Sequence, residues 1–472
     1  MTDGFRTERD SLGEVRVPAG AWYGAQTARA VANFPVSGRR LPATFVRAQA
    51  QIKRAAALAN EAAGRLAPDV AAALVAAAEA VLRGEHDGQF VVDAFQAGAG
   101  TSQNMNLNEV LANLANVALG GERGTYDRVH PNDHANMAQS TNDTIHSAIH
   151  VAAALALRDD LLPALAELEA ALAEKAVEFA GVVKPGRTHL QDAAPLRLGQ
   201  EFGAWAAMMR QGRRRLESAR DALRELCLGG TAVGTGLNAD PRYQGRALAA
   251  LSEATGEPFR PAADLFEAMQ GMDAVVEVAG ALRVVATSLR KIADDLRLLA
   301  SGPRNGLGEL RLPAVQPGSS IMPGKINPVL PEMLDMVCCH VMGLDAAVVT
   351  AAQMGQLELN VMMPIIALDL LEAVQVLAGG ARAFARGCVT GIEADAEVCR
   401  RGAERNLMTA TALAPAIGYE RAAELAREAL ARGLTVRELA RERDLLPEAE
   451  LDRLLDLERL TRNPSDSGAG EA

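Results

Sequence analysis

The chain has 472 residues, a formal net charge of −11, 49% hydrophobic residues and only 3% aromatic residues. An acidic chain repels phosphate backbones, so nucleic acid is a poor candidate partner. A large core made of small and aliphatic side chains suits closely packed helices better than sheets, which favour β-branched and aromatic residues. The bulk properties therefore predict a mainly α protein.

The N-terminus and the cysteines bear on where the chain resides. The first ten residues, MTDGFRTERD, contain no apolar segment and so do not form a secretory signal. No run of about 18 consecutive apolar residues occurs, so we expect no membrane span and a cytoplasmic protein. The five cysteines are odd in number and lack CxxC spacing, which favours buried reduced thiols over disulfides or a zinc site.

The first third of the chain changes from strand signals to helical periodicity. Residues 1–40 carry turn and strand signals, and a helical pattern begins near Ala43. Pro68 suits the first turn of the following helix, where its missing N–H costs nothing. Residues 95–142 are rich in Gly, Asn and Ser and indicate helix ends joined by functional loops.

The middle of the chain is dominated by long helical patterns. One runs from about 144 to 180, with Pro163 as an internal irregularity. Residues 263–301 contain no proline and predict one continuous helix roughly 58 Å long, at about 1.5 Å per residue. Further helical patterns cover 328–350 and 365–388. Helices of this length are usually parts of a bundle.

The sequence texture suggests where domains begin and end. From about residue 390 the pattern changes to short, highly charged helices, and the last residues, RNPSDSGAGEA, are typical of a disordered tail. We expect an N-terminal domain over 1–142, a central helix-bundle domain over 143–390, a small C-terminal domain over 391–460 and a disordered tail over 461–472.

Four polar, glycine-containing segments interrupt the helical pattern, at 98–106, 130–143, 186–192 and 318–328. The last, GSSIMPGKINP, offers many free backbone N–H groups that can cradle an oxyanion, and Lys325 adds a positive charge. Its residue order is not that of a P-loop. On composition alone, an ordinary surface loop explains this segment slightly better, and Ser, Thr and Asn in the first two segments could simply cap helices.

Histidines offer no clear metal site. No HxxxH or HExxH pair with a third ligand stands out around His130, His134 and His150, so we expect no bound metal. A lone His189 would ordinarily be a satisfied core or surface histidine.

Together, the four segments resemble the class II fumarase and aspartase superfamily. GSSIMPGKINP looks like its signature loop, and GTSQNMNLNEV, HPNDHANMAQSTND and GRTHLQDAAPLRLGQEF match in the same order. The resemblance covers nearly the whole chain. It implies a mainly α fold with a small N-terminal domain, a long central helix bundle and a small helical C-terminal domain. It also implies a dicarboxylate substrate, no cofactor, and a homotetramer whose active sites are each shared by three subunits.

The resemblance also implies roles for individual residues. Ser319 would be the general base, and His189 would assist at the leaving-group side with Glu332 as its charge partner. The substrate-binding residues would be Thr101, Ser140, Thr141, Asn142, Thr188, Ser320, Lys325 and Asn327. An accessory dicarboxylate site would comprise His130, Asn132 and Asp133. Taking a proton from the carbon beside a carboxylate creates a second negative charge, which preorganised donors must stabilise. A serine base needs its own alkoxide stabilised, which the loop amides and Lys325 could do.

The leaving group is the open question within this superfamily. Ala99 and Thr141 stand where fumarases usually place serines, and QFVVDAFQAGAG and NPVLPE look more like aspartases, so we expect an aspartate ammonia-lyase. HPND, LGGTAVGTGLN and MVCCHVMG look like fumarases, so a class II fumarate hydratase is the alternative. A lyase for bulkier succinyl-linked substrates and a non-catalytic structural protein on the same fold rank lower, because the polar segments match the small-dicarboxylate branches.

Overall fold

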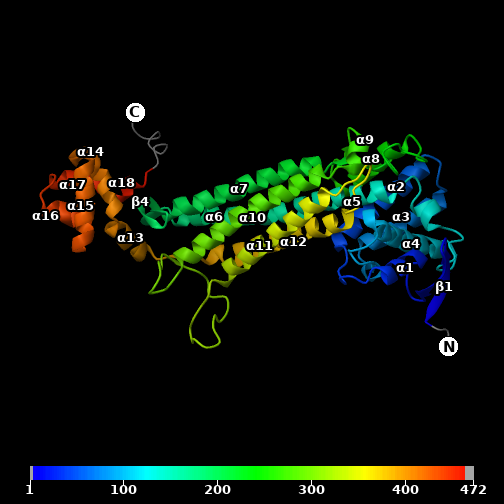
Figure 1. Cartoon of the computed structure of the whole chain (residues 1–472), viewed down its shortest axis with the longest axis horizontal. Helices are drawn as coiled ribbons and strands as arrows, with labels where there is room; N and C mark the ends of the chain where they lie inside the picture. The colour runs from blue at the N-terminus through cyan, green and yellow to red at the C-terminus, as the bar shows by residue number, and fades with distance from the viewer. Residues whose placement is uncertain (1–3, 463–472) are drawn as a thin grey trace. The chain divides into compact units, whose positions relative to one another are not determined.

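The computed structural model describes residues 4–462 and is mainly α, as predicted (Figure 1). The chain divides into two compact units, each assembled from three stretches of sequence. The first comprises Met1–Pro163, Gly212–Thr287 and Val337–Gly379, and the second comprises Ala164–Gln211, Ser288–Met336 and Gly380–Ala472. The expected division into three consecutive domains stays a prediction. The expected tail lies, apart from Thr461 and Arg462, outside the described residues.

The first unit begins with an antiparallel hairpin and continues as helices. Strands β1 (Phe5–Asp10) and β2 (Gly13–Pro18) pair with Arg6 opposite Val17. Its helices are α1 (Ala25–Asn33), α2 (Ala43–Ala62), α3 (Pro68–Leu82), α4 (Thr101–Ala118), α5 (Thr141–Ala156), α8 (Tyr243–Thr255) and α9 (Leu265–Gln270). Strand β5 (Glu225–Leu226) pairs in parallel with β6 (Arg260–Pro261). Pro68 occupies the first turn of α3, as expected.

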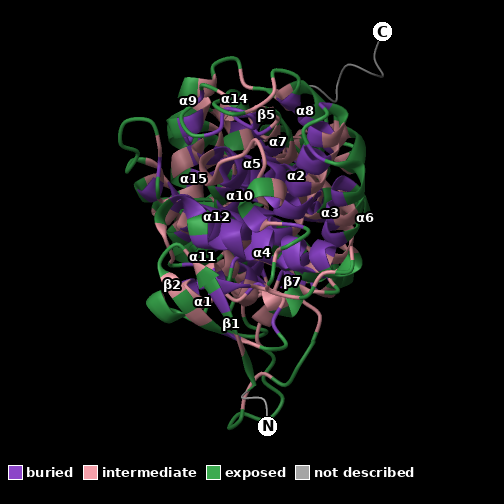
Figure 2. Cartoon of the chain, turned by 90° about the vertical axis from the view of Figure 1, so that its right-hand side faces the viewer, coloured by how far each residue is buried: buried purple, intermediate pink, exposed green. Residues whose placement is uncertain are grey.

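The core of this unit is built from small and aliphatic residues on α2, α3 and α4. Ala50, Ala71 and Leu107 are fully buried in it, and Figure 2 shows buried residues running through α2, α4 and α5. Alanines on α2 and α3 allow these helices to pack closely, which accounts for a large core with few aromatic side chains.

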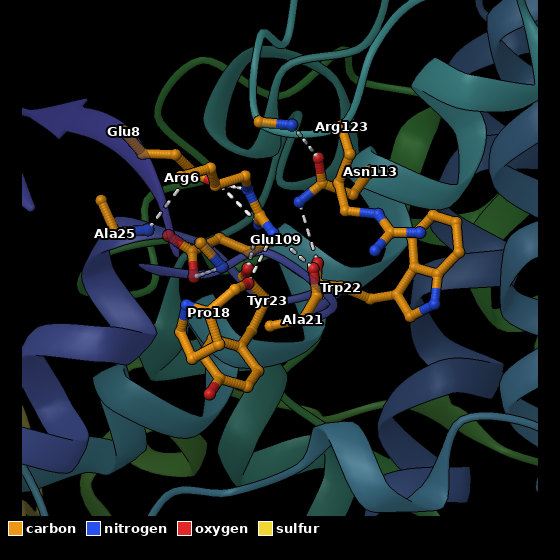
Figure 3. Close-up of polar contacts among 12 residues, drawn as sticks. Arg6, Glu8, Pro18, Ala21, Trp22, Tyr23, Ala25, Glu109, Asn113 and Arg123 are labelled. Carbon is orange, nitrogen blue, oxygen red and sulfur yellow. Dashed lines mark hydrogen bonds and ion pairs between the residues drawn. The ribbon is translucent and has the colours of Figure 1, made fainter. Parts of the chain in front are cut away.

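Arg6 fastens the N-terminal hairpin to the segment that follows it. Its guanidinium donates to the carbonyl oxygens of Pro18 and Ala21, at 3.0 and 2.7 Å. It also donates to the carbonyl oxygen of Tyr23 at 2.7 Å and pairs with the buried Glu8 (Figure 3). These bonds give the carbonyls of the irregular segment after the hairpin a side-chain donor.

Glu109, on α4, caps the beginning of α1. Its carboxylate accepts the backbone N–H groups of Gly24, Gln26 and Thr27 at 2.8–3.1 Å, and the Thr27 hydroxyl at 2.6 Å. The first N–H groups of a helix lack partners within the helix, and a negative charge there also interacts favourably with the helix dipole. Glu109 therefore joins two helices that are distant in sequence (Figure 3).

Five helices contain the boundaries between the two units, namely α6 (Leu162–Glu178), α7 (Leu198–Ala222), α10 (Asp273–Leu299), α11 (Val329–Ala352) and α12 (Met363–Gly387). The second unit also contains most of α6, the antiparallel hairpin of β3 (Val183–Thr188) and β4 (Gln191–Arg197), and the pair β7 (Leu310–Arg311) and β8 (Glu393–Ala394).

Short helices follow β8 in the second unit and enclose a small apolar core. They are α13 (Ala396–Arg405), α14 (Ala414–Ile417), α15 (Tyr419–Arg432), α16 (Val436–Glu442), α17 (Glu448–Leu454) and α18 (Leu457–Leu460). Leu413, Leu425 and Leu439 are almost completely buried in that core. The predicted short, charged helices of this region are present.

The continuous helix predicted over 263–301 is wrong, because the chain forms α9 and then α10. Gly271 leaves the helical conformation, with φ −76° and ψ 146°, directly after Gln270. Its carbonyl oxygen is bonded to Nε2 of His146 at 2.8 Å instead of continuing the helical ladder. A tertiary contact thus ends a helix that periodicity alone would extend, and the 27 residues of α10 span about 40 Å.

The irregularity expected at Pro163 has a defined form. Residues Leu157–Leu161 make a π-helical turn between α5 and α6. Proline lacks an N–H donor and crowds the carbonyl four residues earlier, so a wider turn before it relieves the helix.

The polar stretch 95–142 and the cysteines also differ in part from expectation. Residues Thr101–Ala118 form a complete helix, α4, rather than helix ends. All five cysteines are free, and four are buried, but Cys339 is exposed. Adjacent residues of a helix point about 100° apart, so Cys339 faces away from the core that its neighbour Cys338 enters.

Two helices in the described part of the chain have the length and composition of a membrane span, namely α11 and α12 extended to Gly391. Each contains an 18-residue stretch with a mean hydropathy of 1.5 and no more than two charged residues, so it is apolar without being an uninterrupted apolar run. The α12 stretch is 72% buried within the structure, and the α11 stretch is 33% buried. Core helices of soluble proteins can be equally long and apolar, so length and composition are weak evidence for a membrane.

Candidate active site

In the first unit, the predicted substrate-binding residues lie at the N-termini of two neighbouring helices. Thr101 is the first residue of α4, and Thr141 and Asn142 are the first two of α5. Asn104 on α4 donates to the Thr141 hydroxyl at 3.1 Å, so the two helix starts adjoin. Unpaired N–H groups and the helix dipole favour anions at such ends, which suits a carboxylate ligand.

Ser140 and Asn142 have partners within the fold. The Ser140 hydroxyl caps α5 by accepting the N–H of Asn142 at 3.2 Å. The Asn142 side chain donates to the carbonyl oxygen of Ala232 at 2.8 Å. The helix-capping interpretation therefore holds for Ser140. Thr141 differs, because its oxygen accepts from Asn104, and among the described residues its own hydroxyl hydrogen has no acceptor, which leaves it available to a ligand.

The buried carboxylate of Asp143 holds this turn against a second glycine-rich segment. It accepts the N–H of Ser140 at 2.9 Å and those of Gly229 and Thr231 at 3.0 and 3.1 Å. Burial raises the pKa of Asp143 to about 6, and these hydrogen bonds oppose that rise. Sequence reasoning quoted LGGTAVGTGLN only as a resemblance and did not foresee this contact.

Gly98, Ala99 and Gly100 form a tight turn before α4. The Ala99 N–H donates to the carbonyl oxygen of Val361 at 2.8 Å, and Ala99 is only 4% exposed. Gly100 has φ +83°, and a Cβ there would lie 3.1–3.3 Å from the side chain of Ile145. Both features bring the start of α4 close to its neighbours, and the alanine side chain is packed rather than open.

In the second unit, the signature loop presents Ser319 in a distinctive setting. The Ser319 hydroxyl oxygen accepts the backbone N–H groups of Met322 at 2.8 Å and Ile321 at 3.2 Å. Two fixed N–H donors stabilise a negative charge on the Ser319 oxygen, whereas a serine oxygen without such donors lacks this stabilisation. The adjacent Ser320 is exposed and makes no side-chain hydrogen bond to another described residue. The geometry thus separates two serines that are neighbours in sequence.

The loop is closed at its neck by backbone and side-chain bonds. The Gly318 N–H donates to the carbonyl oxygen of Lys325 at 2.9 Å, and the Asn327 side chain donates to the carbonyl oxygen of Gly318 at 2.6 Å. A Cβ at Gly318 would lie 2.4 Å from the Lys325 oxygen, so only glycine fits. One of the two amide hydrogens of Asn327 is therefore structural. The Lys325 side chain is exposed and free of ion pairs within the described residues.

Thr188 and His189 lie at the tip of the β3–β4 hairpin, and both are exposed. His189 has φ +56°, an uncommon conformation for a residue with a side chain. Neither side chain hydrogen-bonds to another described residue. Glu332 lies in the first turn of α11, and no ion pair joins it to His189 within the described chain.

Beneath this hairpin tip is a buried ionic network. Lys184, 1% exposed, pairs with Glu201 at 2.9 Å and with Glu309 at 3.2 Å. Glu309 also pairs with Arg187 at 2.5 Å. Buried charges are stable only when paired in this way. The network fixes the base of the hairpin to the segment that follows α10.

The expected accessory site contains His130 at the start of a π-helical turn, Pro131–Ala135. Nδ1 of His130 lies 3.3 Å from the backbone nitrogens of Asn132 and Asp133 and also 3.3 Å from Oδ2 of Asp133. The side chains of Asn132 and Asp133 are exposed. Among residues 4–462, no group of three or more His, Cys, Asp or Glu side chains is arranged to hold a metal ion.

Sequence reasoning missed several polar residues that support the first-unit segments, above all Lys53, Asn104 and Asn136. Lys53 is 3% exposed, and its ammonium donates to Oδ1 of Asn136 and Oε1 of Gln139, both at 2.9 Å. The sequence offers little signal, because Lys53 stands beside Arg54 in a helical pattern that contains several other polar residues. Such lysines usually extend to solvent.

Comparison with known proteins identifies the family. The family described as Lyase matches residues 13–343, and the family described as Fumarase C C-terminus matches residues 410–462. The class II fumarate hydratase of Halobacterium salinarum is 52% identical over 469 residues, which cover 99% of each chain. That of Neisseria meningitidis is 49% identical over 95% of this chain and 97% of its own.

Solved structures agree with this assignment. The recombinant class II fumarase of Schistosoma mansoni has a TM-score of 0.94 at 38% identity, over 96% of this chain and 98% of that one. A fumarate lyase:delta crystallin of Brucella melitensis also has a TM-score of 0.94, at 48% identity, over 97% of this chain and 100% of that one. The predicted family and fold are confirmed: the chain is a lyase and belongs to the class II fumarase and aspartase superfamily.

Proposed function

We propose that the protein is a class II fumarate hydratase, which adds water to fumarate to give L-malate and catalyses the reverse reaction. The observation that carries this proposal is the set of relatives named class II fumarate hydratase, which are 45–52% identical over most of the chain. The preference for aspartate ammonia-lyase drawn from the sequence is thereby reversed in favour of its alternative.

The structure suggests why that preference was misplaced. It depended on Ala99 and Thr141 as pocket positions. Ala99 is almost completely buried, and its N–H serves the backbone of Val361, so its side chain is poor evidence about a leaving group. Thr141 keeps a hydroxyl with a free hydrogen, so it can donate as the serine of other fumarases would.

The proposed chemistry in the malate-to-fumarate direction begins at Ser319. Its alkoxide, held by the N–H groups of Ile321 and Met322, takes a proton from the carbon beside a carboxylate. That carboxylate becomes doubly negative, and Lys325 together with helix N-terminal donors stabilises it. The neighbouring C–O bond then breaks, and the departing hydroxide takes a proton on the side assigned to His189 and leaves as water.

We also propose the homotetramer and the three-subunit active sites that the resemblance implies. The candidate residues are dispersed over the chain, as a shared site requires. The most apolar stretch of α11 is only 33% buried within one chain, and Met336 on it is 69% exposed. Large apolar surfaces of this kind mark protein–protein interfaces, and further copies of the chain would cover this one.

A product analysis tests the proposed function. Purified protein is supplied with fumarate alone and with fumarate plus ammonium, and products are identified by NMR. We expect malate in both mixtures and aspartate in neither. Aspartate formed only with ammonium, without malate, would reinstate the ammonia-lyase. Absence of both products from a folded protein would favour the non-catalytic structural protein.

A further inference from the structure

Lys53 occupies a position that is unusual for a lysine. It lies on α2, whose other buried residues are mostly alanine, and it is 3% exposed. Burial lowers the pKa of its ammonium to about 7, and the buried carboxylate of Asp143 opposes that decrease. Keeping such a group in a core costs free energy unless every donor has a partner, so its hydrogen bonds indicate what it does there.

Those bonds all lead to the segment that precedes α5. The ammonium donates to Oδ1 of Asn136 and to Oε1 of Gln139, both at 2.9 Å. Because an ammonium can only donate, these contacts fix the orientation of both amides. Asn136 in turn donates to the carbonyl oxygen of Gln139 at 3.2 Å. Hydrogen bonds to both side-chain and backbone groups therefore hold the segment between Asn136 and Gln139 in place.

Asn136 connects Lys53 to the candidate site through hydrogen bonds. Its Oδ1 accepts from Asn104 at 3.2 Å and from Asn108 at 3.1 Å in addition to Lys53. Asn104 then donates to the Thr141 hydroxyl at 3.1 Å. A chain of direct hydrogen bonds therefore runs from Lys53 through two amides to a hydroxyl predicted to bind substrate.

We propose that Lys53 is a positioning residue for the turn that contains Thr141, and that it tunes the affinity for the dicarboxylate without touching it. This inference rests on the proposed function. Lys53 fixes Asn136, Asn136 fixes Asn104, and Asn104 turns the Thr141 hydroxyl hydrogen toward the ligand. A misplacement of about 1 Å in a binding group can cost about 100-fold in rate, so a remote residue of this kind matters.

The test compares two substitutions on the same face of α2. Lys53→Met keeps the length of the side chain but removes the charge and donors. Gln49→Met, one turn earlier, is the matched control, because it removes the buried bond between Gln49 and Gln103 and leaves Asn136 untouched. We expect Lys53→Met to raise the KM for fumarate about 10- to 100-fold, and Gln49→Met to leave it within about twofold of wild type.

The split between KM and kcat distinguishes positioning from mere stability. A destabilised enzyme has fewer active molecules, which lowers the apparent kcat but leaves the KM of the folded fraction unchanged. A folded Lys53→Met variant with a wild-type KM, or a KM no higher than that of Gln49→Met, overturns the proposal. A wild-type protein that forms no malate overturns the proposed function instead.

A second variant decides the matter should Lys53→Met fail to fold. Asn104→Leu cuts the chain next to Thr141 but leaves Lys53 bonded to Asn136 and Gln139. We expect the same rise in KM in this variant. A wild-type KM for Asn104→Leu would show that the hydrogen-bond chain does not set the position of Thr141, and the proposal would fall.

Discussion

Replacing Ser319 with alanine is the most direct test of the proposed chemistry. The Ser319 oxygen receives two backbone N–H groups, at 2.8 and 3.2 Å. A hydrogen bond to a charged group contributes about 1.5–3 kcal/mol, so the two together favour the alkoxide by about 3–6 kcal/mol. Only Ser319 can use this stabilisation, because the N–H groups belong to a loop that is folded around its oxygen.

Loss of a general base typically lowers a rate about 10²- to 10⁴-fold. We expect Ser319→Ala to lower kcat by that factor, which corresponds to about 2.7–5.5 kcal/mol of activation free energy. Stability should change by about 0.5 kcal/mol or less, because water can satisfy the two N–H groups of a surface loop. Stopped-flow or steady-state assays of malate formation, with thermal melts in parallel, measure both quantities.

Ser320→Ala is the matched control for this experiment. Ser320 has the same chemistry and lies one residue away, but it is exposed, and no backbone N–H of the described residues donates to its hydroxyl. We expect it to raise KM and to change kcat much less than Ser319→Ala does. The reasoning is refuted when Ser319→Ala keeps a kcat within about fivefold of wild type, or when Ser320→Ala loses more.

Four further predictions test other parts of the structure. Lys325→Ala should raise KM and lower kcat together in steady-state assays, because its charge serves substrate and transition state alike; a change in KM alone contradicts this. Light scattering after size-exclusion chromatography should give the mass of four chains, and a fully active monomer would exclude shared sites. Glu109→Ala should cost about 3 kcal/mol or more in denaturant unfolding, because it leaves without an acceptor the N–H of Gly24, just before α1, and two N–H groups in the first turn of α1; a loss below about 1 kcal/mol contradicts the capping role. The pKa of Lys53 is about 7 in the folded protein and 10.5 ordinarily, so between these pH values the unfolded chain binds more protons than the folded one. The free energy of unfolding of the wild type, relative to that of Lys53→Met, should therefore rise with pH in this range, by up to about 1.4 kcal/mol per pH unit. Parallel stability curves from pH 7 to 9 would refute this pKa.

Helical periodicity predicted the long helices well and their interruptions poorly. Apolar residues at spacings of three and four identify a helical face, but they contain no information about tertiary contacts. The break at Gly271 depends on His146, which is 125 residues away and draws the glycine carbonyl out of the ladder. A sequence window that contains only the helix cannot include such a partner.

The burial of α4 illustrates a second limit of prediction from sequence. The sequence of this helix is rich in polar residues, yet its asparagines are buried, because their amides bind the backbone of surrounding loops. Asn113 bonds to Trp22 and Gly124, and Asn116 bonds to the carbonyl of Glu122. A pattern rich in Ser and Asn favours loops or caps when such side chains are assumed to face water. Here they replace the hydrogen bonds that irregular segments cannot make with themselves.

In the candidate site, the sequence shows which residue types are present, but only the fold shows how they are placed. Residue types and their order suffice to recognise a family loop, but Ser319 and Ser320 are chemically identical, and only the fold distinguishes them. The distinction lies in the direction of two N–H groups, which depends on how Gly318, Lys325 and Asn327 close the loop. Lys53 is the converse case, since nothing in its type suggests a site, and its role follows only from the partners that its burial imposes. Residues that react can therefore be found by their chemistry, whereas residues that position them must be found by their contacts.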